Sequence, residues 1–98
     1  EIEDCMLKHP AVLQAAAIGS PDKLRGEIVK AFIVLADGFK ASKGLQEEIQ
    51  NTVRTSLAAY EYPCEIEFVN DLPLTTTGKV RRVELRERER RHKELTNS

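Results

Sequence analysis

IVKAFIVL, residues 28–35, is the most strongly β-forming segment of this 98-residue chain. Branched and aromatic side chains of this kind fit a pleated, buried surface, and Lys30 is the single polar residue among them. The turn-forming pair Asp37-Gly38 follows the segment. We therefore expect a strand over residues 28–35 and a turn directly after it.

The residues before this strand predict a helix and a second strand. Ile2, Met6 and Leu7 fall at helical spacing. Ala11–Ile18 is a nearly continuous run of small apolar residues, which is typical of a fully buried strand. Because the segment Gly19-Ser20-Pro21-Asp22 has strong turn chemistry, we expect that strand to end at its first residue.

The residues after the central segment predict a helix, a strand, a loop and a final helix. Apolar residues repeat at every fourth position over residues 43–58, which indicates an amphipathic helix. Residues 65–69 alternate polar and apolar side chains, like a half-buried strand. Residues 70–79 read as a loop, and residues 80–95 as a highly charged helix. This order predicts an α+β fold in one domain, residues 1–98, with a small mixed β-sheet of about three strands covered by helices.

The composition excludes several classes of protein. With 41% hydrophobic and 32% charged residues, we expect a soluble globular domain, and no apolar run approaches the roughly 20 residues that a membrane span needs. Cys5 and Cys64 lie far apart and there is no histidine cluster, so we expect free thiols, no metal site and a reducing compartment. That compartment would be the cytoplasm, or the mitochondrial matrix in a eukaryote. The sequence opens like a helix in progress, and we expect it to be a segment of a longer protein.

The charged residues near the C-terminus favour a solvated helix over a nucleic-acid-binding one. The net charge of the chain is -1, although residues 79–98 carry eight basic and four acidic side chains. No aromatic residue that could stack on a base follows Phe68. Acidic and basic residues alternate at i,i+4 spacing in the pairs Glu84–Arg88, Glu87–Arg91 and Glu89–Lys93. We expect these pairs to neutralise one another on the helix surface.

Lys79 is the strongest candidate for chemistry, in the segment PLTTTGKVRR (residues 73–82). Its threonines and Gly78 bury little apolar surface, so we expect a weakly held, mobile loop. A lysine ammonium on such a loop suits the neutralisation of a carboxylate or phosphate oxygen. The Gly-Lys pair does not complete a phosphate-binding P-loop, because Pro73 and Val80 stand where glycine and a hydroxyl residue are required. Taken alone, Lys79 is more typical of a solvated surface lysine than of a catalytic one.

Other candidates carry less information. His9 and His92 are isolated in the sequence, and we expect surface or capping positions for both. Arg25 precedes the central strand in a turn, where it is either a solvated cation or a phosphate ligand. Tyr60 and Tyr62 precede a proline and are either core residues or the edge of a ligand site.

The order and spacing of several motifs add a family resemblance. The motifs are Glu1-Ile2-Glu3, His9-Pro10-Ala11-Val12, Gly19-Ser20-Pro21-Asp22, Arg25-Gly26-Glu27, Tyr62-Pro63, Ile66-Glu67-Phe68-Val69, Leu72-Pro73-x-Thr75-x-Thr77-Gly78-Lys79 and Arg82-x-x-Leu85-Arg86. Together they resemble the C-terminal (lid) domain of the adenylate-forming superfamily, which includes acyl-CoA synthetases, the adenylation domains of peptide synthetases and firefly luciferase. The resemblance covers essentially the whole chain. It is strongest to the acetyl-CoA and medium-chain acyl-CoA synthetases.

The resemblance implies an AMP-forming acid–thiol ligase that uses ATP, Mg²⁺ and coenzyme A. A carboxylic acid attacks the α-phosphate of ATP to form an acyl-adenylate, and coenzyme A then displaces AMP. Lys79, in the catalytic loop 70–79, stands where the family has the lysine that touches both the carboxylate and the α-phosphate. The other substrate pockets belong to an N-terminal domain, which is the expected partner, so the chain alone should be inactive.

The resemblance also implies a coenzyme A site. Arg25, Arg54 and the edge Tyr62-Pro63-Cys64 fall where medium-chain synthetases contact coenzyme A, and Gly78 belongs with the cofactor-binding residues of the loop. Leu74 departs from the family, which usually has lysine there, and Thr77 replaces the common serine. Two alternatives stay open: an adenylation module that loads a carrier-protein phosphopantetheine, and a non-catalytic interaction domain.

Overall fold

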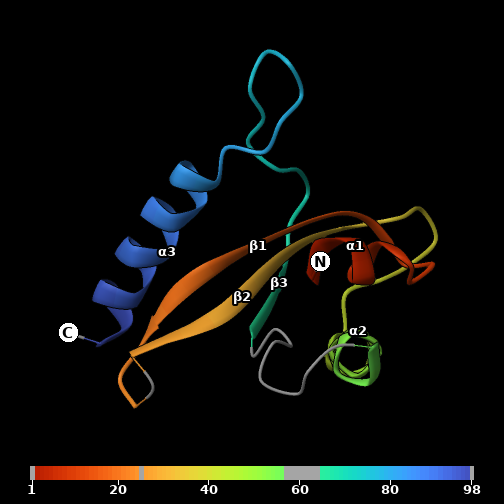
Figure 1. Cartoon of the computed structure of the whole chain (residues 1–98), viewed down its shortest axis with the longest axis horizontal. Coiled ribbons are helices and arrows are strands. Elements are labelled where there is room, and N and C mark those ends of the chain that lie inside the picture. The colour runs from red at the N-terminus through yellow and green to blue at the C-terminus, as the bar shows by residue number, and fades with distance from the viewer. Residues whose placement is uncertain (1, 25, 57–64, 98) are drawn as a thin grey trace.

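A computed structural model describes residues 2–24, 26–56 and 65–97 of the chain. The described residues form three helices and three strands in the predicted order (Figure 1). In chain order the elements are α1 (Ile2–Leu7), β1 (Val12–Asp22), β2 (Gly26–Leu35), α2 (Lys43–Ser56), β3 (Glu65–Phe68) and α3 (Arg82–Asn97).

The three strands form one mixed sheet with β2 in the centre. β1 pairs antiparallel with β2, from Val12 opposite Leu35 to Asp22 opposite Gly26. β3 pairs parallel with the other edge of β2, with Lys30 opposite Glu65. A parallel neighbour requires a crossover connection, and α2 lies within it. The predicted small mixed sheet covered by helices is therefore confirmed.

Helices bury both faces of this sheet, as Figure 1 shows with α3 on one side and α1 and α2 on the other. Alternate side chains of β2 point to opposite faces, which divides the core into two clusters. The first cluster joins β2 to α1 and α2 through Met6, Ala31, Ile33, Ile49, Val53 and Ile66. The second joins β2 to α3 through Ala16, Ile18, Phe32, Val34, Leu72 and Leu85. The single polar residue of the central segment, Lys30, is buried as well.

β1 differs from its prediction in burial and in length. It is an edge strand in which buried residues alternate mostly with partly buried ones, and Leu13 is 60% exposed, so it is not fully buried. It also continues through the predicted turn to Asp22, because β2 supplies pairing partners as far as Gly26. Pro21 is tolerated near the end of an edge strand, where a missing N–H interrupts no central ladder.

His9 is buried rather than at the surface. The backbone N–H of Ala11 donates to its Nδ1 at 3.1 Å, so Nδ1 is the acceptor nitrogen of the ring. Its Nε2 therefore carries the proton and meets the carboxylate of Glu48 on α2. The side chain joins the end of α1 to α2 from inside the fold.

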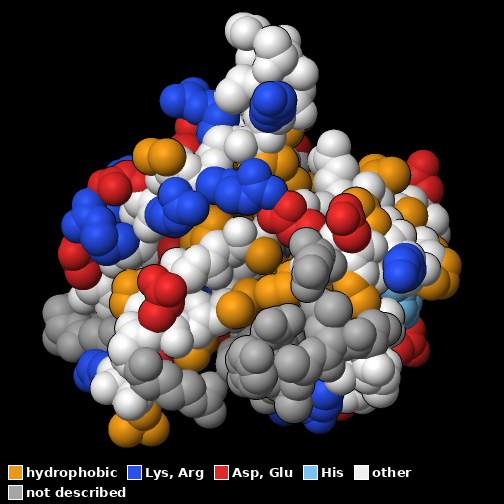
Figure 2. Space-filling model, viewed as in Figure 1, with side chains coloured by type: hydrophobic (Ala, Val, Ile, Leu, Met, Phe, Trp, Pro, Cys, Tyr) orange, Lys and Arg blue, Asp and Glu red, His pale blue; other side chains and the backbone are white. Residues whose placement is uncertain are grey.

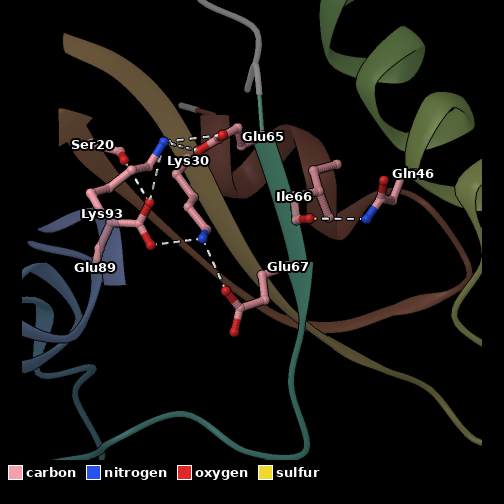
Figure 3. Close-up of polar contacts among 8 residues, drawn as sticks. All are labelled: Ser20, Lys30, Gln46, Glu65, Ile66, Glu67, Glu89 and Lys93. Carbon is pink, nitrogen blue, oxygen red and sulfur yellow. Dashed lines mark hydrogen bonds and ion pairs between the residues drawn. The ribbon is translucent and has the colours of Figure 1, made fainter. Parts of the chain in front are cut away.

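The polar network around Lys30 connects α3 to the sheet (Figure 3). The Nζ atom of Lys30 donates to Glu89 Oε1 at 2.7 Å and to Glu67 Oε1 at 2.9 Å. The hydroxyl of Ser20 donates to Glu89 Oε2 at 2.6 Å. One carboxylate of α3 thus bonds to side chains from both β1 and β2.

This network corrects the prediction of a self-paired helix surface. Glu89 is 2% exposed, and its main partner is Lys30 on the sheet. The Nζ atom of Lys93 lies 4.0 Å from Glu89 Oε2, and it also lies 3.1 Å from Oε1 of Glu65 on β3. Glu87 pairs with Arg90 on the exposed face of α3. The i,i+4 spacing could not reveal that the sheet would supply a buried cation.

Burial and hydrogen bonding shift the pKa values of Lys30 and Glu89 in opposite directions. Burial by itself would lower the pKa of Lys30, but hydrogen bonds to Glu89 and Glu67 outweigh it and raise that pKa. Burial would raise the pKa of Glu89, but hydrogen bonds from Lys30 and Ser20 outweigh it and lower that pKa. Both side chains are therefore charged in the folded chain, and each compensates the other.

Replacing Lys30 with Met should destabilise the chain by about 3 kcal/mol, because Glu89 would remain buried without its cation. The double variant Lys30→Met, Glu89→Leu should recover much of this loss, since the only charge then left without its partner is the half-exposed carboxylate of Glu67. Urea denaturation of the three proteins measures both effects. Arg90→Met, which breaks the exposed pair with Glu87, is the control and should change stability little. Equal losses in Lys30→Met and Arg90→Met would contradict the assignment.

Glu89 should also make the fold sensitive to acid. Its pKa is lowered in the folded chain, so its contribution is present above the ordinary glutamate range and is lost as pH falls through the folded value. We expect the free energy of unfolding to drop as pH falls below the ordinary range of a glutamate carboxyl. Glu89→Gln should weaken that dependence, while Glu87→Gln should leave it unchanged. Denaturation midpoints measured across this range test the expectation, and identical slopes for Glu89→Gln and the parent chain would refute it.

Candidate functional site

Residues 73–81, which carry Lys79, fold as a closed hairpin rather than a loose loop. Leu74 and Val80 form an antiparallel bridge. The N–H of Thr75 donates to the carbonyl of Lys79 at 2.7 Å, and the N–H of Arg81 donates to the carbonyl of Pro73 at 2.8 Å. These bonds close the neck of the hairpin and lead directly into α3.

Threonine hydroxyls hold the tip of the hairpin. Thr75 Oγ1 accepts the N–H of Lys79 at 3.1 Å and lies 3.0 Å from Thr77 Oγ1. Gly78 has a φ of 85°, a conformation that L side chains rarely adopt, and its N–H donates to the carbonyl of Thr75 at 3.0 Å. The expected weak hold on this backbone is therefore wrong. The hydroxyls that suggested a poorly packed loop form the hydrogen bonds that order it.

Lys79 is exposed on a hairpin that stands away from the rest of the molecule (Figure 1). Figure 2 shows that the projecting tip is covered mainly by uncharged side chains. Within residues 2–24, 26–56 and 65–97, the ammonium of Lys79 has no ion-pair partner. A cation held in this way is available to an anion that another molecule or another domain supplies.

Arg82, the first residue of α3, connects the base of the hairpin to α1. Its Nη2 atom contacts Glu3 Oε1, and Glu3 Oε2 accepts the N–H of Ala17 at 2.7 Å. Burial would raise the pKa of Glu3, but hydrogen bonds from Arg82 and Ala17 outweigh it and lower that pKa. Both side chains belong to the motifs quoted above, but no periodic signal could pair residues at the two ends of the chain.

The residues predicted to contact coenzyme A are only partly described. Arg54 is exposed in the last turn of α2. Arg25, Tyr62, Pro63 and Cys64 lie outside the described residues. The hairpin tip with Gly78 and Lys79 belongs to a different part of the fold from Arg54, so the structure does not gather all of the predicted residues in one place.

A cleft of about 530 Å³ lies beside the turn between β1 and β2. It is lined by Pro21, Asp22, Lys23, Leu24, Lys30, Glu65, His92 and Lys93. Lys23 and Lys93 were not expected to share a site, because only the packing of α3 on the sheet brings them together. The cleft therefore combines basic side chains from a turn, a strand and a helix, with two carboxylates among them.

The described part of the chain offers no metal centre. No group of three or more His, Cys, Asp or Glu side chains in it is arranged to hold a metal ion. The same residues include no helix that is long and apolar enough to cross a membrane.

Comparison with known proteins identifies the family. Residues 1–79 match the sequence model of the AMP-binding enzyme C-terminal domain, so the chain belongs to this family. It is 53% identical over 89 residues to 4-hydroxybutyrate–CoA ligase 1 from Metallosphaera sedula, covering 91% of this chain and 16% of that ligase. It is 50% identical over 91 residues to the mitochondrial acyl-coenzyme A synthetase ACSM4 from Rattus norvegicus, with the same two coverages.

Solved structures agree with the sequence comparison. An acyl-CoA synthetase from Brucella canis superimposes with a TM-score of 0.91 at 47% identity, covering 94% of this chain and 17% of that one. The anthranilate CoA ligase AuaEII, solved with anthranoyl-AMP, gives a TM-score of 0.84 at 41% identity, with coverages of 90% and 17%. This chain thus spans about one sixth of the length of these relatives. They do not favour a carrier-protein-loading module or a non-catalytic interaction domain.

Proposed function

We propose that this chain is the C-terminal domain of an AMP-forming acyl-CoA synthetase, in which Lys79 acts in the formation of the acyl-adenylate. The observation that carries the proposal is the exposed, unpaired ammonium of Lys79 on an ordered, projecting hairpin. Membership of the AMP-binding enzyme family supports it, as do the CoA ligases among the relatives. The partner is the N-terminal domain of the same enzyme, and the cytoplasm or mitochondrial matrix stays the predicted location.

The proposed chemistry follows from charge. Adenylate formation brings a carboxylate against the α-phosphate of ATP, and negative charge accumulates on the oxygens around phosphorus. An ammonium placed between the two anions lowers their repulsion and stabilises the transition state. A projecting hairpin can carry such a charge into a pocket formed by another domain. A lysine suits this task because its charge is compact and its stem is long.

The remaining substrates of the synthetase would be ATP, a carboxylic acid and coenzyme A. Mg²⁺ would accompany ATP, held largely by the phosphates of the nucleotide. For coenzyme A we propose the end of the sheet where the parallel strands β2 and β3 begin, at Gly26 and Glu65. The nearby cleft, with Lys23 and Lys93 in its wall, would suit the phosphates of this ligand.

Lys79→Ala should abolish adenylate formation while thioester formation from a supplied acyl-adenylate survives. Removing such a preorganised donor should slow the first step on the order of 100-fold or more. The assay uses a chimera in which this chain replaces the matching segment of the Metallosphaera sedula ligase. Pyrophosphate release reports the first half-reaction, and thioester formation reports the second.

Lys40→Ala is the matched control for this test, because Lys40 is also an exposed lysine outside the helices and strands. It should leave both half-reactions unchanged. If Lys79→Ala slows the two half-reactions equally, or slows neither, the role proposed for Lys79 is wrong.

Arg25→Ala and Arg54→Ala should each raise the KM for coenzyme A about tenfold, since each would remove a charge-assisted hydrogen bond to a phosphate. Adenylate formation in the same chimera should not change, because coenzyme A enters only in the second step. Arg88→Ala, at an exposed position of α3, is the control. An unchanged KM in both variants would exclude these arginines from the coenzyme A site.

A further inference from the structure

Glu3 and Arg82 stand at nearly opposite ends of the chain, 79 residues apart, yet their side chains meet at the base of the hairpin that carries Lys79. Arg82 follows Arg81, whose N–H closes the hairpin neck on the carbonyl of Pro73. The guanidinium is therefore attached within three residues of Lys79. On the face shown in Figure 2, basic and acidic side chains lie in contact just below the projecting hairpin.

Glu3 holds Arg82 from a fixed position. Its second carboxylate oxygen accepts the N–H of Ala17, a backbone group of the edge strand β1, at 2.7 Å. This bond restrains the carboxylate with respect to the sheet as well as to α1. One acidic side chain thus connects α1, the edge of the sheet and the start of α3.

Among the residues that the structure describes, few other contacts could set the direction of the hairpin. Leu72 is buried and Val80 is partly buried against the cluster under α3, so the apolar packing lies at the neck. Beyond the neck, Leu74 is 45% exposed. The apolar packing therefore anchors the neck, and the Arg82–Glu3 contact restrains the backbone that leaves it.

The pair is better placed to direct the hairpin than to stabilise the fold. The side chains of Arg82 and Glu3 are 41% and 25% exposed, and ion pairs of this kind contribute little to stability. Catalysis is far more sensitive to position, because a displacement of about 1 Å can slow a reaction on the order of 100-fold. A small tilt at the neck becomes a larger displacement at the tip.

We propose that Glu3 and Arg82 form a positioning pair that directs Lys79 towards the reacting anions during adenylate formation. The inference rests on the function proposed above for Lys79. Neither side chain touches substrate in this proposal. Both act by setting the direction of the hairpin. The position of Lys79 therefore depends on how α1 is oriented.

Glu3→Gln and Arg82→Gln, introduced separately into the chimera, should each lower the kcat of adenylate formation about tenfold or more. The KM for ATP and thioester formation from a supplied acyl-adenylate should stay unchanged, and so should the melting temperature. Arg82→Lys, which keeps a cation facing Glu3, should recover much of the lost rate. A merely structural role would not separate the two half-reactions in this way.

Glu87→Gln and Arg90→Gln are the matched controls, because they break an ion pair of the same kind on the exposed face of α3. Both should leave adenylate formation unchanged. If Lys79→Ala abolishes this step but Glu3→Gln and Arg82→Gln do not slow it, the positioning pair is refuted and the function of Lys79 stands. If Lys79→Ala itself has no effect, the proposed function fails. A parallel loss of melting temperature and of both half-reactions would show that the pair is structural, and would overturn the inference.

Discussion

The burial of β2 on both faces is the constraint on which the rest of the structure depends. Its alternate side chains pack against α1 and α2 on one side and against α3 on the other. The alternation of side chains along this strand therefore decides where each helix packs. The central position also allows β1 and β3 to pair with it in opposite senses. Lys30 brings a charge into this strand, and the fold must compensate it.

That compensation determines how α3 sits. Leu85 and Glu89 are four residues apart on the same face of the helix, and one enters the apolar cluster while the other binds Lys30. The hydrogen bond from the buried ammonium of Lys30 adds a directional contact to this apolar packing. Because α3 continues directly from the hairpin, the same contacts set the neck from which Lys79 projects. The buried polar network around Lys30 thus supports the helix from which the hairpin with the exposed Lys79 extends.

In the proposed function, the ordered hairpin supplies the position and the unpaired ammonium of Lys79 supplies the charge. The hairpin satisfies its own backbone through Thr75 and Gly78 and leaves the ammonium of Lys79 unpaired among the described residues. An ordered hairpin on a small domain can deliver such a charge without reorganising it, which is the main requirement for electrostatic catalysis. Under the proposed function, the anions that Lys79 would meet are bound by a domain outside this chain. Under the same proposal, the direction of the hairpin at its neck matters more than the side chains at its tip.

The sequence by itself determined the order of the elements, the central strand and the amphipathic α2, since each depends on local pattern. The spacing of motifs also made Lys79 the candidate for chemistry, and its role stays a proposal. It misjudged β1, because only the pairing with β2 shows that an apolar run lies at an edge and continues through turn-forming residues. It also placed Glu89 on the surface, and it could not pair Glu3 with Arg82. Such contacts join residues far apart in the chain, and only the packing of helices on the sheet decides which charges meet.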